Sequence, residues 1–358
     1  MSKRPLDQAR GKVFVGMSGG VDSSVSAALL QKAGFSVTGV FIKVWHPDWL
    51  PCEWQEERRD AMRVAVKLGI PFLTFEFQDE YKKSVVDYML YEYKEGRTPN
   101  PDVMCNKEIK FGSFLRKAKK MGADYIATGH YARIDNKKLL EGADKNKDQS
   151  YFLWTLGQEE LDHVLFPVGG FEKKEVRKLA NKFGLPTAEK KDSQGICFIG
   201  KVDMKEFLQH YIPSAPGDVL NEVGETVGRH EGVIFYTIGE RHGFDITKRT
   251  PHDEPMYIVA KNLGNNTITV SANLGRDADS YSARKVRLGN VNWISGQAPD
   301  PAKTYGARIR YHQEKQKCAI SGSIIAFEPP QKNLSIGQSL VLYDGEVCLG
   351  GGIMEEIL

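Results

Sequence analysis

The segment with the clearest chemistry is residues 18–24, which read Ser-Gly-Gly-Val-Asp-Ser-Ser. It lies between an apolar run that ends at Met17, typical of a buried strand, and the largely apolar stretch 25–30, typical of a helix. Gly19 and Gly20 let the backbone approach an oxyanion, the serine hydroxyls can donate hydrogen bonds, and the N-terminus of a following helix attracts anions. The segment therefore predicts a phosphate-binding loop.

This loop differs from two common nucleotide-binding loops. It lacks the lysine of the Walker sequence Gly-x-x-x-x-Gly-Lys-Ser/Thr and the glycine spacing Gly-x-Gly-x-x-Gly of dinucleotide-binding proteins. It resembles instead the PP-loop of the ATP pyrophosphatase superfamily. That resemblance implies binding of ATP, adenylation of a carbonyl oxygen and release of pyrophosphate, and an ordinary strand–glycine–helix turn is the alternative.

A cysteine and a carboxylate lie close together further along the chain. Two prolines within three residues predict a stiffened loop over residues 96–107, followed by a helix that begins near Lys107 or Ile109. Near a helix N-terminus the reactive thiolate form of Cys105 is favoured, and Asp102 could transfer protons. The alternative is a cysteine that is simply buried in packing.

A second cysteine, Cys197, follows the polar segment 190–195 far along the chain. Cysteines distant in sequence can meet at the mouth of a sheet. If Cys105 and Cys197 do so, one sulfur can carry a persulfide and the other can resolve the disulfide formed when sulfur is delivered. Core packing is again the alternative for each of them.

Polar residues in two other loops could complete a pocket for a nucleotide or a base. Gly129 and His130 come directly after an expected strand, and Lys147, Asp148 and Gln149 lie in a polar stretch that leads into an apolar one. His130 is either a ligand contact or a satisfied polar residue. The composition of the second stretch by itself indicates only a loop.

Composition is that of a globular protein in a reducing compartment. The chain has 358 residues, 41% hydrophobic and 27% charged, with a formal net charge of +3. Its five cysteines include no Cys-x-x-Cys pair, which argues against a zinc site and a disulfide-stapled fold. The polar N-terminus does not have the pattern of a signal peptide, and no apolar run reaches the length of a membrane span. We therefore expect a cytoplasmic protein.

The order of expected elements predicts three domains. Strands at 37–44, 71–77 and 125–127 alternate with helices at 56–68, 81–94 and 109–121, which is typical of an α/β domain with a parallel, Rossmann-like sheet at residues 1–211. Its last helices are expected at 171–183 and 204–211. Runs at 232–238, 256–260 and 267–270 predict a small mixed α/β central domain at 212–275. Five strands at 286–293, 305–312, 317–327, 339–343 and 346–355 predict a closed C-terminal β-barrel at 283–358.

Two basic features could contact RNA. The helical stretch 107–120 is rich in lysine and arginine, although such a run is often only a solvated face. In the expected strand 305–312, alternation places Arg308, Arg310 and His312 on one face, suited to contact with an RNA backbone. An ordinary exposed strand face is the alternative.

Five motifs in a fixed order give the chain a resemblance to the tRNA-specific 2-thiouridylases. They are residues 18–24, Asn100-Pro101-Asp102 with Cys105, Gly129-His130-Tyr131, Lys147-Asp148-Gln149-Ser150, and Asp-Ser-Gln-Gly-Ile-Cys at 192–197. The resemblance continues with lower specificity to the C-terminus. One departure is Ile42, where the family has methionine, and this conservative change concerns only a detail of the expected adenine pocket.

The resemblance implies a reaction in two stages. ATP and Mg²⁺ occupy the loop, and O2 of the wobble uridine in a tRNA anticodon attacks the α-phosphate and releases pyrophosphate. Cys197 bears a persulfide received from a sulfur-donor protein, such as a cysteine desulfurase or a sulfur-relay protein, and sulfur moves to C2 with loss of AMP. Cys105 then resolves the product as a disulfide with Cys197, and Asp102 transfers a proton.

The resemblance also implies two sets of binding residues and no protein ligand for a metal. The nucleotide-binding residues are Gly16, Met17, Ser18, Gly19, Gly20, Val21, Asp22, Ser23, Ser24, Ile42 and Gly129. The tRNA-binding residues are Asn100, Pro101, Asp102, His130, Lys147, Asp148, Gln149, Arg310, Tyr311 and Gln338. Some of the latter would hold a base that has left its stack, since an anticodon base must be splayed out to enter a pocket.

Two other classes of function stay open. A PP-loop ligase that forms an amide or C–N bond, as amidotransferases and argininosuccinate synthases do, would use the loop but has no use for Cys105 and Cys197. A non-catalytic RNA-binding protein would use the basic helix and the barrel without turning over ATP.

Overall fold

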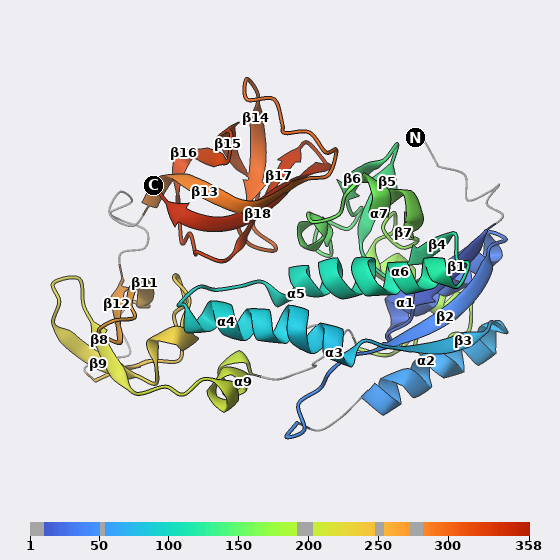
Figure 1. The fold of residues 1–358 in the computed structure, drawn as a ribbon, viewed down its shortest axis with the longest axis horizontal. Helices are drawn as coiled ribbons and strands as arrows, with labels where there is room; N and C mark the ends of the chain where they lie inside the picture. Colours follow the sequence, from blue (N-terminus) through green and yellow to red (C-terminus); the bar gives the residue numbers. More distant parts are fainter. Residues whose placement is uncertain (1–10, 51–53, 192–202, 248–253, 273–281) are drawn as a thin grey trace.

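The computed structural model describes residues 11–50, 54–191, 203–247, 254–272 and 282–358. They form three sheets that follow one another along the chain (Figure 1). The predicted order of a parallel α/β domain, a small central domain and a β-barrel is confirmed. Across these described ranges, no helix combines the length and the apolar composition that crossing a bilayer requires.

The N-terminal sheet is parallel throughout, with its first strand at the centre. Its spatial order is β3 (Phe72–Glu76), β2 (Ser36–Lys43), β1 (Lys12–Gly16), β4 (Tyr125–Ala127) and β7 (Val164–Leu165). Successive side chains of β1 point to opposite faces. Val13 and Val15 pack with α1 (Val21–Lys32), α2 (Trp54–Leu68) and α8 (Lys173–Lys182), whereas Phe14 packs with the helices of the other face.

Two long helical runs cover that other face and lie side by side (Figure 1). The first joins α3 (Gln78–Tyr81), η2 (Lys82–Asp87) and α4 (Tyr88–Lys94), and the second joins α5 (Pro101–Met104), η3 (Cys105–Ser113) and α6 (Phe114–Lys120). The second begins earlier than predicted. Pro101 occupies its first position, where the missing N–H costs nothing, and the Asn100 side chain accepts a hydrogen bond from the Val103 amide at 3.2 Å. The predicted loop up to Lys107 was therefore wrong beyond Asn100.

The central sheet follows α9 (Met204–Tyr211), whose N-terminus is capped by the Asp203 carboxylate. Its spatial order is β10 (Asp245–Ile246), β9 (Thr226–His230), β8 (Gly217–Leu220), β12 (Thr267–Ser271) and β11 (Tyr257–Asn262). The predicted strand at 232–238 was wrong. Gly232 has a φ of +147° and opens a short 3₁₀ turn, η5 (Val233–Phe235), so the apolar side chains there are buried without forming a strand.

The C-terminal sheet closes into a barrel of six strands, one more than predicted. Around the barrel they are β13 (Ser282–Trp293), β16 (Ile324–Lys332), β15 (Gln316–Ser321), β14 (Thr304–Arg308), β17 (Ser339–Asp344) and β18 (Val347–Ile357), and β18 pairs back with β13. The additional strand arises because the predicted strand at 317–327 is a hairpin. Its turn contains Gly322, which has a φ of +60° that side-chain-bearing residues rarely adopt.

A hairpin of the first domain joins the barrel. It consists of β5 (Ala132–Asp135) and β6 (Lys138–Glu141), and β6 pairs with the start of β18 through Leu139 and Leu140. The next elements are η4 (Ser150–Leu153) and α7 (Gln158–His163). Hydrogen bonding between backbones therefore connects the first and last domains, and Figure 1 shows the hairpin beside the barrel.

Candidate functional site

The loop between β1 and α1 is held in a fixed shape by its own residues. Gly19 has a φ of +74°, and a Cβ atom there would lie 2.4 Å from the Glu57 carbonyl oxygen, so only glycine fits. The Ser24 hydroxyl donates to the Gly20 carbonyl oxygen at 2.7 Å, and the Ser18 amide donates to the Ser23 hydroxyl at 3.3 Å. No described side chain caps the N-terminus of α1. Its first amides are thus left for an anion.

The loop after β4 packs directly against this helix N-terminus. A Cβ atom on Gly129 would lie 2.7 Å from the Ser23 amide nitrogen and 2.9 Å from the Asp22 carbonyl carbon. Both neighbours are backbone atoms that cannot turn aside. On the other side, the Ile42 side chain is buried near Gly16, at the end of the adjacent strand. The predicted nucleotide-binding residues therefore gather at one edge of the sheet, the carboxyl ends of its strands.

Two residues that were not predicted as site residues meet the acidic side chain of this loop. The Lys173 ammonium lies 2.8 Å from both carboxylate oxygens of Asp22, and the Tyr131 hydroxyl donates to one of them at 2.7 Å. Lys173 begins α8, a helix that the amphipathic pattern predicted without indicating a role for its first residue. Because Lys173 is 151 residues from Asp22 in the chain, no local signal could have found the contact.

The predicted catalytic residues lie in the second long helical run. Asp102 and Cys105 are three positions apart and so share one side of it, but Cys105 lies beyond the first turn and its side chain is 0% exposed. Next to it, the Asn106 amide donates to the Phe152 carbonyl oxygen at 3.3 Å, which joins this helix to η4. Cys197 lies outside the described residues, so its meeting with Cys105 stays a prediction.

His130 is a buried, aromatic-lined residue. Its Nδ1 lies 2.7 Å from the Thr128 hydroxyl, and its ring centroid lies 5.7 Å from that of Phe111 and 6.0 Å from that of Phe166. Burial, followed by the nearby positive charge of Lys110, holds the pKa of His130 well below its usual value. The imidazole is therefore neutral at physiological pH and can act as a hydrogen-bonding group rather than a charge.

Hydrogen bonds to Asp148 and Gln149 hold the segment 147–149 in place. The Gln149 side-chain oxygen accepts a hydrogen bond from the Tyr131 amide at 3.0 Å. The Asp148 carboxylate is buried and accepts hydrogen bonds from the Gly142 amide at 2.9 Å and the Ser150 hydroxyl at 3.0 Å. Asp148 thus shapes the turn from within instead of projecting to solvent.

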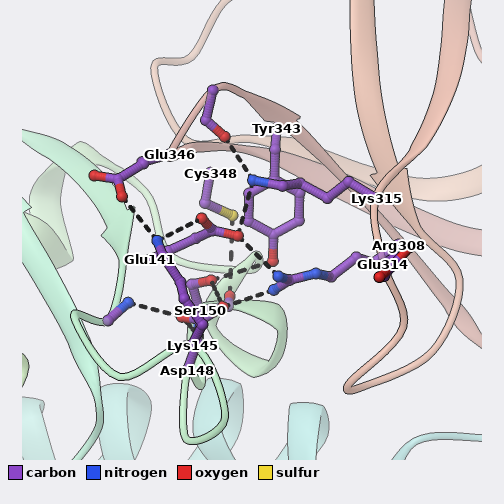
Figure 2. Close-up of polar contacts among 12 residues, drawn as sticks. Glu141, Lys145, Asp148, Ser150, Arg308, Glu314, Lys315, Tyr343, Glu346 and Cys348 are labelled. Atoms are coloured by element: carbon purple, nitrogen blue, oxygen red, sulfur yellow. Dashed lines mark hydrogen bonds and ion pairs between the residues drawn. The ribbon is translucent and has the colours of Figure 1, made fainter. Parts of the chain in front are cut away.

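Figure 2 shows the residues that neutralise the buried Asp148 carboxylate. The Arg308 guanidinium reaches Asp148 at 2.6 Å and Glu141 at 2.9 Å, with side-chain exposures of 12% for Arg308, 1% for Asp148 and 2% for Glu141. Lys315 of the barrel also lies 3.0 Å from Glu141, and the Tyr343 hydroxyl contacts that of Ser150 at 3.2 Å. The cluster of Glu141, Asp148, Arg308 and Lys315, here called the junction cluster, joins the barrel to the first domain.

The junction cluster corrects one expectation about strand 305–312. Arg308 is buried in ion pairs, so it does not form an exposed face with Arg310 and His312 for an RNA backbone. The strand also ends at Arg308, and His312 has a φ of +66°, which interrupts the alternation on which that prediction depended.

The other predicted barrel residues, Arg310, Tyr311 and Gln338, lie near the segment that leads to Asn100 or near η4. Gln338 donates to the Thr98 and Pro99 carbonyl oxygens at 3.0 and 3.2 Å, and Arg310 donates to the Ile238 carbonyl oxygen at 2.7 Å. The Tyr311 ring lies 4.5 Å from that of Phe152. Burial, followed by the charge of Asp148, raises the pKa of Tyr311 to about 12, so its hydroxyl stays protonated.

Arg310 therefore links the barrel to the central domain, to which Ile238 belongs, whereas Gln338 links the barrel to the first domain. Within the described ranges, no group of three or more His, Cys, Asp and Glu side chains is arranged to hold a metal ion.

Family models match three consecutive parts of the chain. The model described as tRNA methyl transferase HUP domain matches residues 11–201, the tRNA methyl transferase PRC-barrel domain matches 205–272, and the aminomethyltransferase beta-barrel domain matches 283–354. These matches follow the three sheets of the fold.

Curated relatives match the chain over nearly its whole length. The tRNA-specific 2-thiouridylase MnmA 2 of Geobacillus kaustophilus is 45% identical over 100% of this chain and 97% of its own. The enzymes named tRNA-specific 2-thiouridylase MnmA from Halalkalibacterium halodurans and Pseudomonas putida are 46% and 45% identical, covering 100% and 98% of this chain and 97% and 96% of theirs. A solved 4-thiouridine synthetase–RNA complex with ATP is more distant, with 22% identity, a TM-score of 0.37, and coverage of 56% of this chain and 50% of its own.

Removing the guanidinium of the junction cluster tests its contribution to stability. We expect Arg308→Met to lower the free energy of unfolding by about 3–5 kcal/mol, because it removes the guanidinium that pairs with the buried Asp148 carboxylate. Arg287→Met is the matched control, since the Arg287–Glu356 pair lies on the same barrel at 2.8 Å but is 45% and 53% exposed. That control should cost less than about 1 kcal/mol in chemical denaturation. Equal losses in the two variants would contradict a special role for Arg308.

Proposed function

This chain belongs to the tRNA-specific 2-thiouridylase family, and we propose that it uses ATP to activate a uridine in tRNA and then replaces the O2 atom of that uridine with sulfur. The observation that carries the proposal is the meeting of the 18–24 loop with Gly129 at the carboxyl edge of the parallel sheet. Identity of about 45% to 2-thiouridylases over the full chain supports the same activity. The proposed location is the cytosol, where thiols stay reduced.

ATP is proposed to bind with its phosphates at the uncapped N-terminus of α1. The free amides and the helix dipole there favour negative charge, and the tight packing of Gly19 and Gly129 gives the loop a fixed shape. Mg²⁺ would accompany the nucleotide, because phosphate oxygens are ligands that it prefers.

The wobble uridine is proposed to enter between the first domain and the barrel. Asn100, Asp102 and Tyr311 lie on this junction, and the Phe152 and Tyr311 rings offer faces on which an unstacked base can rest. Gln338 and Arg310 hold the loops of this junction through backbone carbonyls. We infer that Asp148 acts through Ser150 and Arg308, which position the segment that contains Lys147 and Gln149.

The chemistry we propose balances in three steps. Uridine O2 attacks the α-phosphate of ATP and pyrophosphate leaves, which makes C2 electrophilic. The outer sulfur of a persulfide on Cys197, loaded by a sulfur-donor protein, attacks C2 and AMP leaves with the former O2. The Cys105 thiolate then attacks the Cys197 sulfur, so that 2-thiouridine is released and a Cys105–Cys197 disulfide forms. Asp102, one helical turn from Cys105, is the proposed proton carrier.

The whole reaction can be tested with the intact chain, unmodified tRNA, Mg-ATP, and a cysteine desulfurase with cysteine as the sulfur source. We expect tRNA-dependent pyrophosphate release and 2-thiouridine, measured by mass spectrometry of the nucleosides. In Cys105→Ser, 2-thiouridine should fall to background while pyrophosphate release continues, because adenylation precedes the sulfur steps.

Cys318→Ser is the matched control, since Cys318 is a buried cysteine in the barrel, far from the loop in the chain. It should keep full activity. Unchanged 2-thiouridine in Cys105→Ser would contradict the sulfur steps. Pyrophosphate release without any need for tRNA would favour a ligase of another kind, and tRNA binding without ATP turnover would favour a non-catalytic RNA-binding protein.

The packing of the loop leads to a second prediction. Gly129→Ala should weaken binding of ATP by about tenfold or more, because its Cβ must push back the backbone at Asp22 and Ser23. Gly170→Ala is the control, since a Cβ there has no heavy atom within 4 Å. Equilibrium binding of a non-hydrolysable ATP analogue to each variant measures the effect. An unchanged affinity in Gly129→Ala would mean that nucleotide binds elsewhere.

A further inference from the structure

The phosphate-binding loop has no lysine of its own, yet the fold brings one to it. The Lys173 ammonium lies 2.8 Å from each carboxylate oxygen of Asp22, and Asp22 is in the first turn of α1. Exposure is low for both side chains, 13% for Lys173 and 29% for Asp22. A cation is therefore present, partly shielded from water, beside the helix N-terminus at which the nucleotide phosphates are proposed to bind.

Two further contacts hold this ion pair in place. The backbone amide of Lys173 donates to the Asp144 carboxylate at 2.9 Å, which fixes the start of α8. The Tyr131 hydroxyl donates to Asp22 at 2.7 Å, and the Lys173 ammonium lies 5.8 Å from the centroid of the Tyr131 ring. Tyr131 follows Gly129 in the loop after β4, so the loops of two strands and the beginning of α8 converge on one carboxylate.

The charges of Lys173 and Asp22 affect how a polyphosphate can bind at this helix N-terminus. An uncompensated carboxylate in the first turn of α1 would repel a polyphosphate that binds there. A lysine ammonium is a compact charge with three donors, which suits it to phosphate oxygens. In Walker loops, a lysine within the loop has this task, and the present loop has Asp and Ser at its end instead.

We propose that Lys173 is the cation of the nucleotide site, held by Asp22 before ATP binds and donating to the polyphosphate when ATP is present. The inference rests on the proposed function, because it requires the 18–24 loop to be the ATP site. It assigns to α8, a helix whose sequence shows only an amphipathic pattern, a direct part in binding the nucleotide.

An ion pair that merely ties α8 to α1 is the competing explanation. The next residue provides the comparison, because Lys174 has the same charge on the same helix but is 74% exposed and pairs with Glu172 at its N-terminus. Removing either charge changes the net charge of the protein equally. Only removal of the Lys173 charge should affect binding of nucleotide.

The test measures equilibrium binding of α,β-methylene-ATP with Mg²⁺ to the full chain, by calorimetry and without tRNA. We expect Lys173→Met to weaken binding by about 10- to 100-fold, the range for losing hydrogen bonds to a charged group. Lys174→Met should stay within about twofold of the wild type. Lys173→Arg, which keeps the charge, should recover part of the affinity. Thermal unfolding of each variant shows whether the fold is intact.

A double variant distinguishes a direct contact between Lys173 and phosphate from a role in which Lys173 only neutralises the charge of Asp22. If Lys173 donates to phosphate, Asp22→Asn combined with Lys173→Met should recover only part of the affinity lost in Lys173→Met, because the repulsion by Asp22 is removed but the contact to phosphate is still missing. Recovery of wild-type affinity in the double variant would overturn the proposal, as would wild-type affinity in Lys173→Met. A wild-type chain that does not bind the analogue would overturn the proposed ATP site together with this inference. Loss confined to the Lys173 variants supports both.

Discussion

Two buried carboxylates impose the constraint on which the arrangement of the domains depends. Glu141 and Asp148 belong to the first domain, and an ionised carboxylate inside a protein requires a partner of opposite charge. The barrel provides these partners with Arg308 and Lys315, more than 150 residues away in the chain. The barrel is thereby fixed against the first domain, with Tyr311 placed beside Phe152 at the proposed entrance for a base.

The parts of the site that sequence could predict are those encoded locally. Residues 18–24 are contiguous, and the hydrogen bonds that shape the loop join residues of the same segment. The loop and the helix that follows it can therefore be predicted from the local sequence pattern. The contacts that complete the site depend instead on residues that are far apart in the sequence. Lys173 with Asp22 and Arg308 with Asp148 join ordinary charged residues 151 and 160 residues apart, and neither pair has a local pattern.

The fold shows the same division between local and distant determinants. Apolar runs located four of the five strands of the parallel sheet, missing the two-residue β7, and most of the barrel. Residues that are compatible with more than one local structure led to the wrong predictions. Pro101 excludes a helix interior yet suits a first helical position, and Gly322 is compatible with a strand until its positive φ is known. The apolar residues after Gly232 are buried, as expected, but they form a 3₁₀ turn and not a strand. An apolar run predicts burial but does not distinguish these two structures.

The pairing of β6 with β18 has a consequence for how the chain is made. Lys145, just after β6, and Glu346, just before β18, are in contact but 201 residues apart. At about 5–20 residues per second, a ribosome takes roughly 10–40 s to produce the intervening chain. During that interval β6 lacks its pairing with β18 and Glu141 lacks its barrel partners, so the edge of the hairpin and the junction cluster are completed only when the last strands emerge.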